Sequence, residues 1–101
     1  CLDAKRRVLA CREVGEGSVN SANVPIRRIV EMALAANATT VIRAHNHPSG
    51  ILFPSAADIH QTQTVSVMLK QLQVSLLDHF IVGNNEVRSM RDSNETSYLF
   101  F

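Results

Sequence analysis

Tryptophan is absent from this chain of 101 residues, and cysteine, proline and glycine are few. Two cysteines, Cys1 and Cys11, cannot make the disulfide framework of a small secreted domain. We therefore expect reduced thiols and a cytoplasmic protein, with a bridge across a hairpin as the alternative. The chain also lacks internal repeats and low-complexity linkers, so it is predicted to form one domain over residues 1–101.

Long hydrophobic runs and a dominant charge are missing as well. No stretch approaches the ~18 apolar residues that a membrane span needs. Charged residues interrupt the N-terminus at Asp3 and at 5–7, so it does not look like a signal peptide. Ten Lys and Arg balance nine Asp and Glu, and Lys5-Arg6-Arg7 is the densest basic group. This weak basic footprint argues against autonomous DNA binding and leaves a small acidic ligand open.

With 46% hydrophobic and 19% charged residues, the composition is that of a globular domain. Apolar periodicity and turn residues predict the order β-β-α-β-α-β-β, a mixed α/β sheet with flanking helices. The predicted elements are two strands in residues 1–14, a helix from Pro25 to Asn37, and then strand 39–44, helix 56–72, strand 74–82 and strand 86–90.

Each predicted helix has an apolar stripe that should face the core. The stripe of the first helix comprises Ile26, Ile29, Val30, Ala33 and Leu34. That of the second is less regular and comprises Ile59, Val65, Met68, Leu69 and Leu72. The apolar residues 98–101 at the C-terminus could pack back on the domain or be the truncated start of another element.

The strongest chemical signal lies where the strand 39–44 ends. Residues two apart on a strand point to the same face, so His45 and His47 can aim both imidazoles at one point. Asp58 follows eleven residues after His47, in the first turn of the next helix, and can supply a third ligand. Three protein ligands and one open position for water are typical of catalytic zinc, which lowers the pKa of that water toward ~7.

A structural interpretation of the same residues needs no metal. Ser55 and Asp58 form the Ser-x-x-Asp pattern of a helix N-cap, which would stabilise the helix by about 1 kcal/mol. Histidines in loops are common, and Pro48 and Gly50 could simply form a turn. Spacing alone leaves both interpretations open.

The whole string His45-Asn46-His47-Pro48-Ser49-Gly50, followed by Ser55 and Asp58, resembles the metal motif of JAB/MPN (JAMM) metalloproteases. Its His-Asn-His-Pro-Ser-Gly form is similar to the RadC family of bacterial proteins. Further matching segments, in chain order through residues 1–90, are Cys1-Leu2-Asp3, Arg7-Val8, Gly17-Ser18-Val19-Asn20, Asn37-Ala38 and Asp78-His79-Phe80-Ile81-Val82-Gly83. The resemblance implies a JAB/MPN (cytidine deaminase-like) architecture.

The resemblance also implies roles. His45, His47 and Asp58 would bind Zn²⁺, and the Ser55 hydroxyl would hydrogen-bond the oxyanion of a scissile amide. Because Ser55 could also cap the helix through the same oxygen, we expect the two roles to compete.

Four other residues are expected to have no direct part in the chemistry. Asn46 and Ser49 would shape the loop, His79 would be a hydrogen-bonded structural residue, and His60 would lie on the surface.

The general-base glutamate of the wider family would precede Cys1, so the chain is expected to be an N-terminally truncated domain. Glu13 and Glu16 are the nearest acidic residues in sequence and are predicted to be solvated.

The favoured function is zinc-dependent peptide or isopeptide hydrolysis, with a peptide or protein substrate. The alternative is a DNA repair-associated module with a vestigial or structural metal site, in which Lys5-Arg6-Arg7 would contact nucleic acid. A bare interaction module, with the ligands stapling the loop to the helix, is a third hypothesis. It fits less well because structural zinc usually has four protein ligands.

Overall fold

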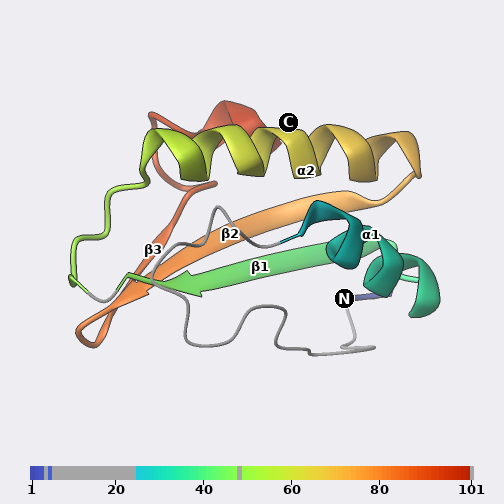
Figure 1. Ribbon diagram of the computed structural model, residues 1–101, viewed down its shortest axis with the longest axis horizontal. Coiled ribbons are helices and arrows are strands. Elements are labelled where there is room, and N and C mark those ends of the chain that lie inside the picture. The colour runs from blue at the N-terminus through green and yellow to red at the C-terminus, as the bar shows by residue number, and fades with distance from the viewer. Residues whose placement is uncertain (4, 6–24, 48, 101) are drawn as a thin grey trace.

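The computed structural model describes residues 1–3, 5, 25–47 and 49–100, and within them the chain forms two α-helices, three strands and a short 3₁₀-helix (Figure 1). In chain order these elements are α1 (Ile26–Ala35), β1 (Thr40–Asn46), α2 (Ala56–Gln71), β2 (Ser75–Gly83), β3 (Glu86–Ser89) and η2 (Ser97–Phe100). The predicted α/β class with a mixed sheet is confirmed.

The predicted order β-β-α-β-α-β-β is not matched. Among the described residues the first predicted strand is reduced to one antiparallel bridge, in which the Leu2 N–H donates to the Thr40 carbonyl at 2.7 Å. Leu2 is buried, and no further pair of this ladder occurs within the part of the chain that the structure describes. The second predicted strand lies outside the described residues. So does Cys11, so the expected reduced thiols, and the alternative bridge to the half-buried Cys1, stay predictions.

The ends of α1 follow local sequence chemistry. Pro25 was predicted as its first residue but occupies the N-cap, with φ −66° and extended ψ, so the helix begins at Ile26. Asn37, the predicted end, adopts φ 53° two residues beyond the last helical residue. Asparagine tolerates this left-handed conformation, which turns the chain out of a helix.

The buried faces of the two helices differ from the predicted stripes at three positions. In α1, Ile29 and Ala33 are buried as predicted, whereas Leu34 is 55% exposed. In α2, Met68 and Leu72 are also exposed, which contradicts the predicted face. The buried residues of α2 are instead Asp58, Gln61, Thr62, Val65 and Leu69. The apolar stripe was irregular because the first turns of α2 bury polar side chains.

The sheet has the strand order β1-β2-β3, with β1 and β2 parallel and β2 and β3 antiparallel. The chain passes from β1 to β2 through α2, which lies along the sheet in Figure 1. Asn84 and Asn85 connect β2 to β3 with φ 31° and 66°, the positive values that two-residue hairpin turns need. The predicted turn and closing strand are therefore confirmed.

Two of the C-terminal apolar residues pack back on the domain, as one of the two alternatives had it, whereas Tyr98 is exposed. Leu99 and Phe100 of η2 are buried, and the Ser66 hydroxyl on α2 donates to the Leu99 carbonyl at 3.0 Å. They complete a core whose other members are Ile29, Ala33, Ala38, Val41, Val65, Leu69, Val74, Leu76, Ile81 and Met90.

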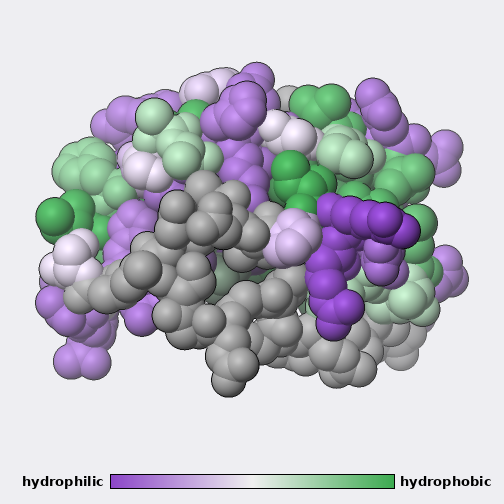
Figure 2. All heavy atoms as spheres, viewed as in Figure 1, coloured by the Kyte–Doolittle hydropathy of each residue, from purple (hydrophilic) through white to green (hydrophobic). Residues whose placement is uncertain are grey.

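Apolar side chains also reach the surface in the loop between β1 and α2, where Ile51 is 61% and Phe53 66% exposed. Figure 2 shows apolar side chains on the left of the molecule, where Figure 1 places this loop. Neither helix of the described ranges combines the length and the hydropathy that crossing a membrane requires.

At Gly50 this loop packs closely against the β2–β3 hairpin. Gly50 has φ 79°, and a Cβ built on it would lie 2.2 Å from Nδ2 of Asn84. Across the same contact, a Cβ on Gly83 would lie 3.0 Å from the Gly50 Cα. The loop that follows the two histidines therefore depends on glycine for both its backbone conformation and its close packing.

We expect Gly50→Ala to lower the free energy of unfolding by about 1–2 kcal/mol, because an L side chain is strained at this φ. Urea denaturation of the metal-free protein measures the change. Combining it with Asn84→Gly removes the collision but not the backbone strain, so only part of the loss should be recovered. Wild-type stability in Gly50→Ala would contradict this account.

Candidate metal centre

His45 and His47 emerge together from the carboxyl end of β1. The strand ends at Asn46, and the His47 N–H donates to the Val82 carbonyl of β2 at 2.8 Å, which continues the parallel ladder past the strand end. The centroids of the two imidazole rings are 4.6 Å apart. Their side chains are 10% and 19% exposed, so the pair lies at the rim of the domain and not in its interior.

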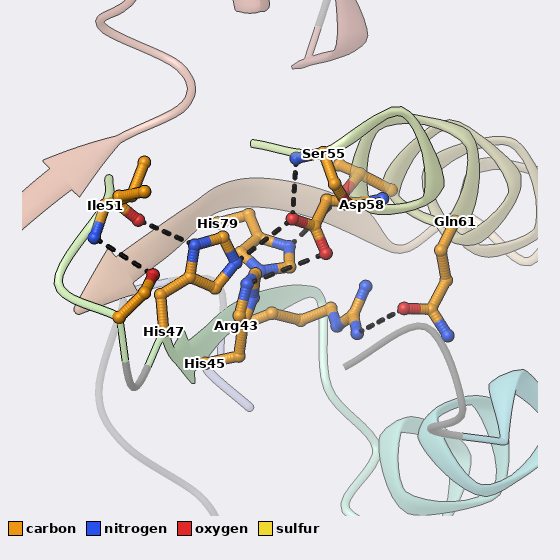
Figure 3. Close-up of polar contacts among 10 residues, drawn as sticks. Arg43, His45, His47, Ile51, Ser55, Asp58, Gln61 and His79 are labelled. Atoms are coloured by element: carbon orange, nitrogen blue, oxygen red, sulfur yellow. Dashed lines mark hydrogen bonds and ion pairs between the residues drawn. The ribbon is translucent and has the colours of Figure 1, made fainter. Parts of the chain in front are cut away.

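Asp58 faces both rings from the first turn of α2 (Figure 3). Its Oδ2 lies 3.2 Å from Nε2 of His47, and its Oδ1 lies 3.7 Å from Nε2 of His45. The Ser55 N–H donates to Oδ2 at 2.8 Å, and the Asp58 N–H donates to the Ser55 hydroxyl at 3.0 Å. This capping box fixes the carboxylate, so the helix-capping and metal-ligand interpretations of these residues are compatible.

The burial of Asp58 separates this site from an ordinary cap. An aspartate in the first helical turn normally keeps its carboxylate in water, whereas the Asp58 side chain is only 3% exposed. A buried carboxylate needs positive charge or several hydrogen bonds beside it. Two imidazole nitrogens are its neighbours here, which places a cation-binding set of atoms at one point.

The proton position on His47 is fixed by the main chain. Its Nδ1 lies 2.7 Å from the Ile51 carbonyl, an acceptor, so Nδ1 carries the proton and donates it. In the neutral ring, Nε2 then presents a lone pair to the Asp58 carboxylate. Two electron-rich atoms 3.2 Å apart repel each other unless a proton or a metal ion lies between them.

His45 presents the second ligand atom. Its Nε2 is buried and has no hydrogen-bond partner among the described residues, while its Nδ1 is hydrogen-bonded to Nε2 of His79. An unsatisfied buried nitrogen is costly, and a metal ion is one group that would satisfy it.

The three residues fit a zinc ion. Ligand atoms of His45, His47 and Asp58 all lie within 4.8 Å of one another. Atoms bound tetrahedrally at 2.0–2.1 Å are about 3.3 Å apart, close to the 3.2 Å between Nε2 of His47 and Oδ2 of Asp58. Two imidazoles and a carboxylate are also a donor set that zinc accepts, so the cluster could hold such an ion.

Sequence patterns missed the polar residues behind this cluster. Arg43 lies two residues before His45 on the same face of β1, and its Nη2 donates to Oε1 of Gln61 at 3.3 Å. Burial lowers the pKa of Arg43 to about 10, although the Asp58 carboxylate opposes that shift. Two spacings could have indicated these residues. Arg43 lies two residues from His45 on a strand, and Gln61 lies three residues from Asp58 on a helix, so each pair shares a face.

His79 is the buried neighbour of His45. Each ring nitrogen has a partner, since Nδ1 lies 3.2 Å from the Thr62 hydroxyl, so the predicted hydrogen-bonded role is confirmed. Burial, followed by the Arg43 charge, lowers the His79 pKa to about 3. Burial also lowers the pKa of His45, against the opposing effect of Asp58. Both rings are therefore neutral near pH 7.

Ser55 is exposed and caps α2 by accepting a hydrogen bond. The cap uses a lone pair of the hydroxyl oxygen and leaves its proton available for a second partner. The cap is therefore present, whereas the expected competition between capping and oxyanion binding stays a prediction.

Ser49 shapes the loop, as predicted, because its hydroxyl accepts from the Ile51 N–H at 3.3 Å. Asn46 is exposed at the end of β1, and His60 is exposed on α2, as predicted for a surface residue. In the basic group 5–7 only Lys5 is described, and it is exposed. Glu13 and Glu16 lie outside the described residues.

We expect acid to destabilise the metal-free protein through His79. Between about pH 6.5 and 3 the unfolded chain binds a proton at this residue and the folded chain does not, so stability falls as pH falls. The slope that His79 contributes should approach about 1.4 kcal/mol per pH unit. Urea denaturation at several pH values in a chelator should give a shallower slope for His79→Gln.

The same substitution at exposed His60 is the matched control and should leave the slope as in the wild type. Parallel curves for the wild type and His79→Gln would contradict the assignment.

Comparison with known proteins agrees with this geometry. The sequence model of the family described as "RadC-like JAB domain" matches residues 1–95. Similar proteins named "UPF0758 protein" occur in Ectopseudomonas mendocina (50% identical), Stutzerimonas stutzeri (48%) and Photobacterium profundum (45%). Each alignment covers 90% of this chain and 41% of the relative, so the chain spans about two-fifths of the length of these relatives.

Proposed function

The chain belongs to the RadC-like JAB domain family, and on that premise we propose that it is a zinc-binding, JAMM-type metallohydrolase domain that acts on peptide or isopeptide bonds. His45, His47 and Asp58 are the zinc ligands of this proposal. Ser55 is its oxyanion-binding residue, and its substrate is a peptide or a protein.

The observation that carries the proposal is the convergence of two imidazole nitrogens and a buried carboxylate at one point. In the neutral tautomer of His47 that donates from Nδ1 to the Ile51 carbonyl, Nε2 presents a lone pair to Asp58. Nε2 of His45 has no hydrogen-bond partner among the described residues, and the buried Asp58 carboxylate lies beside both nitrogens. In a metal-free protein such an arrangement is repulsive, whereas a divalent cation would satisfy all three groups together.

Zinc held by three protein ligands would polarise the scissile carbonyl and supply a water molecule acidic enough to attack it near neutral pH. The chain's own residues prepare the site. The capping box holds the Asp58 carboxylate, and the Ile51 carbonyl orients the His47 ring. The Ser55 hydroxyl retains a proton that it can donate to the oxyanion of a tetrahedral intermediate.

A complete hydrolytic cycle also needs a residue that takes a proton from the attacking water as a general base and then returns it to the leaving amine as a general acid. Within the described residues Asp58 is committed to the ligand set, and we assign the base to none of the others. The proposal therefore separates zinc binding and oxyanion binding, which this chain should perform, from the complete hydrolytic cycle.

We expect one zinc ion per chain, lost in each of the variants His45→Ala, His47→Ala and Asp58→Ala. Elemental analysis after exposure to zinc and gel filtration measures the stoichiometry. The melting temperature should be higher with zinc than without it, because binding to the folded state stabilises that state. His60→Ala is the matched control and should bind like the wild type. A wild-type protein that takes up no zinc and gains no stability from it would overturn the proposed function.

We expect Ser55→Ala to weaken the binding of a phosphonamidate peptide, which mimics the tetrahedral oxyanion, by roughly 10–100-fold. This factor corresponds to the loss of one hydrogen bond to a charged group. Titration calorimetry on the zinc-loaded protein measures this affinity without requiring turnover. Ser55→Thr, which keeps the hydroxyl, should bind within a few fold of the wild type.

Loss of the cap should also lower the free energy of unfolding by about 1 kcal/mol. Denaturation of the chelator-treated protein measures this effect separately from inhibitor binding. Unchanged inhibitor affinity in Ser55→Ala would restrict this residue to capping.

A further inference from the structure

A short hydrogen-bonded chain of side chains runs from the candidate metal centre into the domain. Nδ1 of His45 is bonded to Nε2 of His79, and Nδ1 of His79 lies 3.2 Å from the Thr62 hydroxyl. The three residues come from β1, β2 and α2, and the two rings stand nearly perpendicular, at 88° (Figure 3 shows the His45 and His79 rings). We call His45, His79 and Thr62 the histidine relay.

The fold places the relay with little freedom. The parallel register pairs Arg43 with His79, so His79 lies next to the strand segment that carries His45. Thr62 lies one helical turn after Asp58, on the buried face of α2. His79 is 1% exposed and Thr62 is fully buried, so water cannot replace either partner.

The direction of these bonds decides whether His45 can bind a metal. A neutral imidazole has one N–H and one lone pair. If His45 donates from Nδ1 to His79, its Nε2 keeps the lone pair that faces Asp58, and His79 must then carry its own proton on Nδ1 and donate to Thr62. In the opposite direction the proton lies on Nε2 of His45, and the ligand atom is blocked.

We propose that His79 and Thr62 are positioning residues that hold His45 in the tautomer whose Nε2 can bind zinc, with the Thr62 hydroxyl as the terminal acceptor. This inference rests on the proposed function and extends it to two buried residues. Metal-binding histidines commonly donate their second N–H to a fixed acceptor, and that acceptor raises metal affinity. His47 uses the Ile51 main-chain carbonyl for this purpose, whereas His45 depends on side chains that substitution can change.

The relay predicts that Thr62→Val, which removes the terminal acceptor at nearly constant volume, weakens zinc binding by roughly 10–100-fold. Thr62→Ser keeps the hydroxyl and should stay within a few fold of the wild type. Competition with a chromophoric chelator measures the dissociation constants. Thr64→Val, also on α2, removes a hydroxyl that bonds only the helix's own His60 carbonyl among the described residues, and it should leave zinc affinity unchanged.

The experiment also separates positioning from packing. Urea denaturation in chelator reports the stability of each metal-free variant, and a purely structural Thr62 would change that stability while zinc affinity stays constant. Long-range ¹H–¹⁵N spectra of the histidine rings give the tautomers directly. In the zinc-loaded wild type we expect protons on Nδ1 of both His45 and His79.

The outcomes distinguish the two proposals. If the wild type binds no zinc, the proposed function fails and the relay fails with it. If the wild type binds zinc but Thr62→Val binds it equally well, the relay alone is overturned. If Thr62→Val does not fold, the wild-type spectra still decide, because a proton on Nε2 of His79 in the zinc-loaded protein contradicts the proposed direction.

Discussion

The site depends on one buried carboxylate. Asp58 is fixed by the main-chain N–H of Ser55 while its two oxygens face the imidazoles of His45 and His47. A buried negative charge is tolerated only where positive charge or strong donors compensate it. The capping hydrogen bond supplies part of that compensation. The rest of the negative charge faces the point where the two imidazole nitrogens converge. The capping box therefore holds the first turn of α2 at the carboxyl end of β1.

The surrounding residues are organised around the same requirement. Lone pairs must face the carboxylate, so each histidine needs an acceptor on its far side. The loop after β1 provides one through the Ile51 carbonyl, and its close contact with the hairpin through Gly50 keeps that carbonyl in place. The interior provides the other through His79. The orientation of the two histidine rings at the rim of the domain thus depends on both a loop that requires glycine and a layer of buried polar side chains.

The elements that could be predicted from the sequence are those set by local interactions. The strand before the two histidines, the cap at Ser55 and the hairpin turn at Asn84 are set mainly by neighbours a few residues apart. Each is present, although the strand was predicted over 39–44 and runs over Thr40–Asn46. The buried face of α2 was mispredicted at Met68 and Leu72 because apolar periodicity assumes an apolar core. Here the first two turns bury Asp58, Gln61 and Thr62, which depends on how α2 packs on the sheet and which apolar periodicity does not detect.

The same limit explains why the motif located the ligands but not their supports. His45, His47 and Asp58 lie within fourteen positions of one another, whereas Thr62 and His79 join the site only when α2 packs on the sheet. A buried polar layer of this kind is expensive unless every member is satisfied, and one unsatisfied member is destabilising. Nε2 of His45 is such a member among the described residues. The cost of leaving that nitrogen unpartnered is the physical reason to regard the cluster as a binding site and not merely as a helix cap.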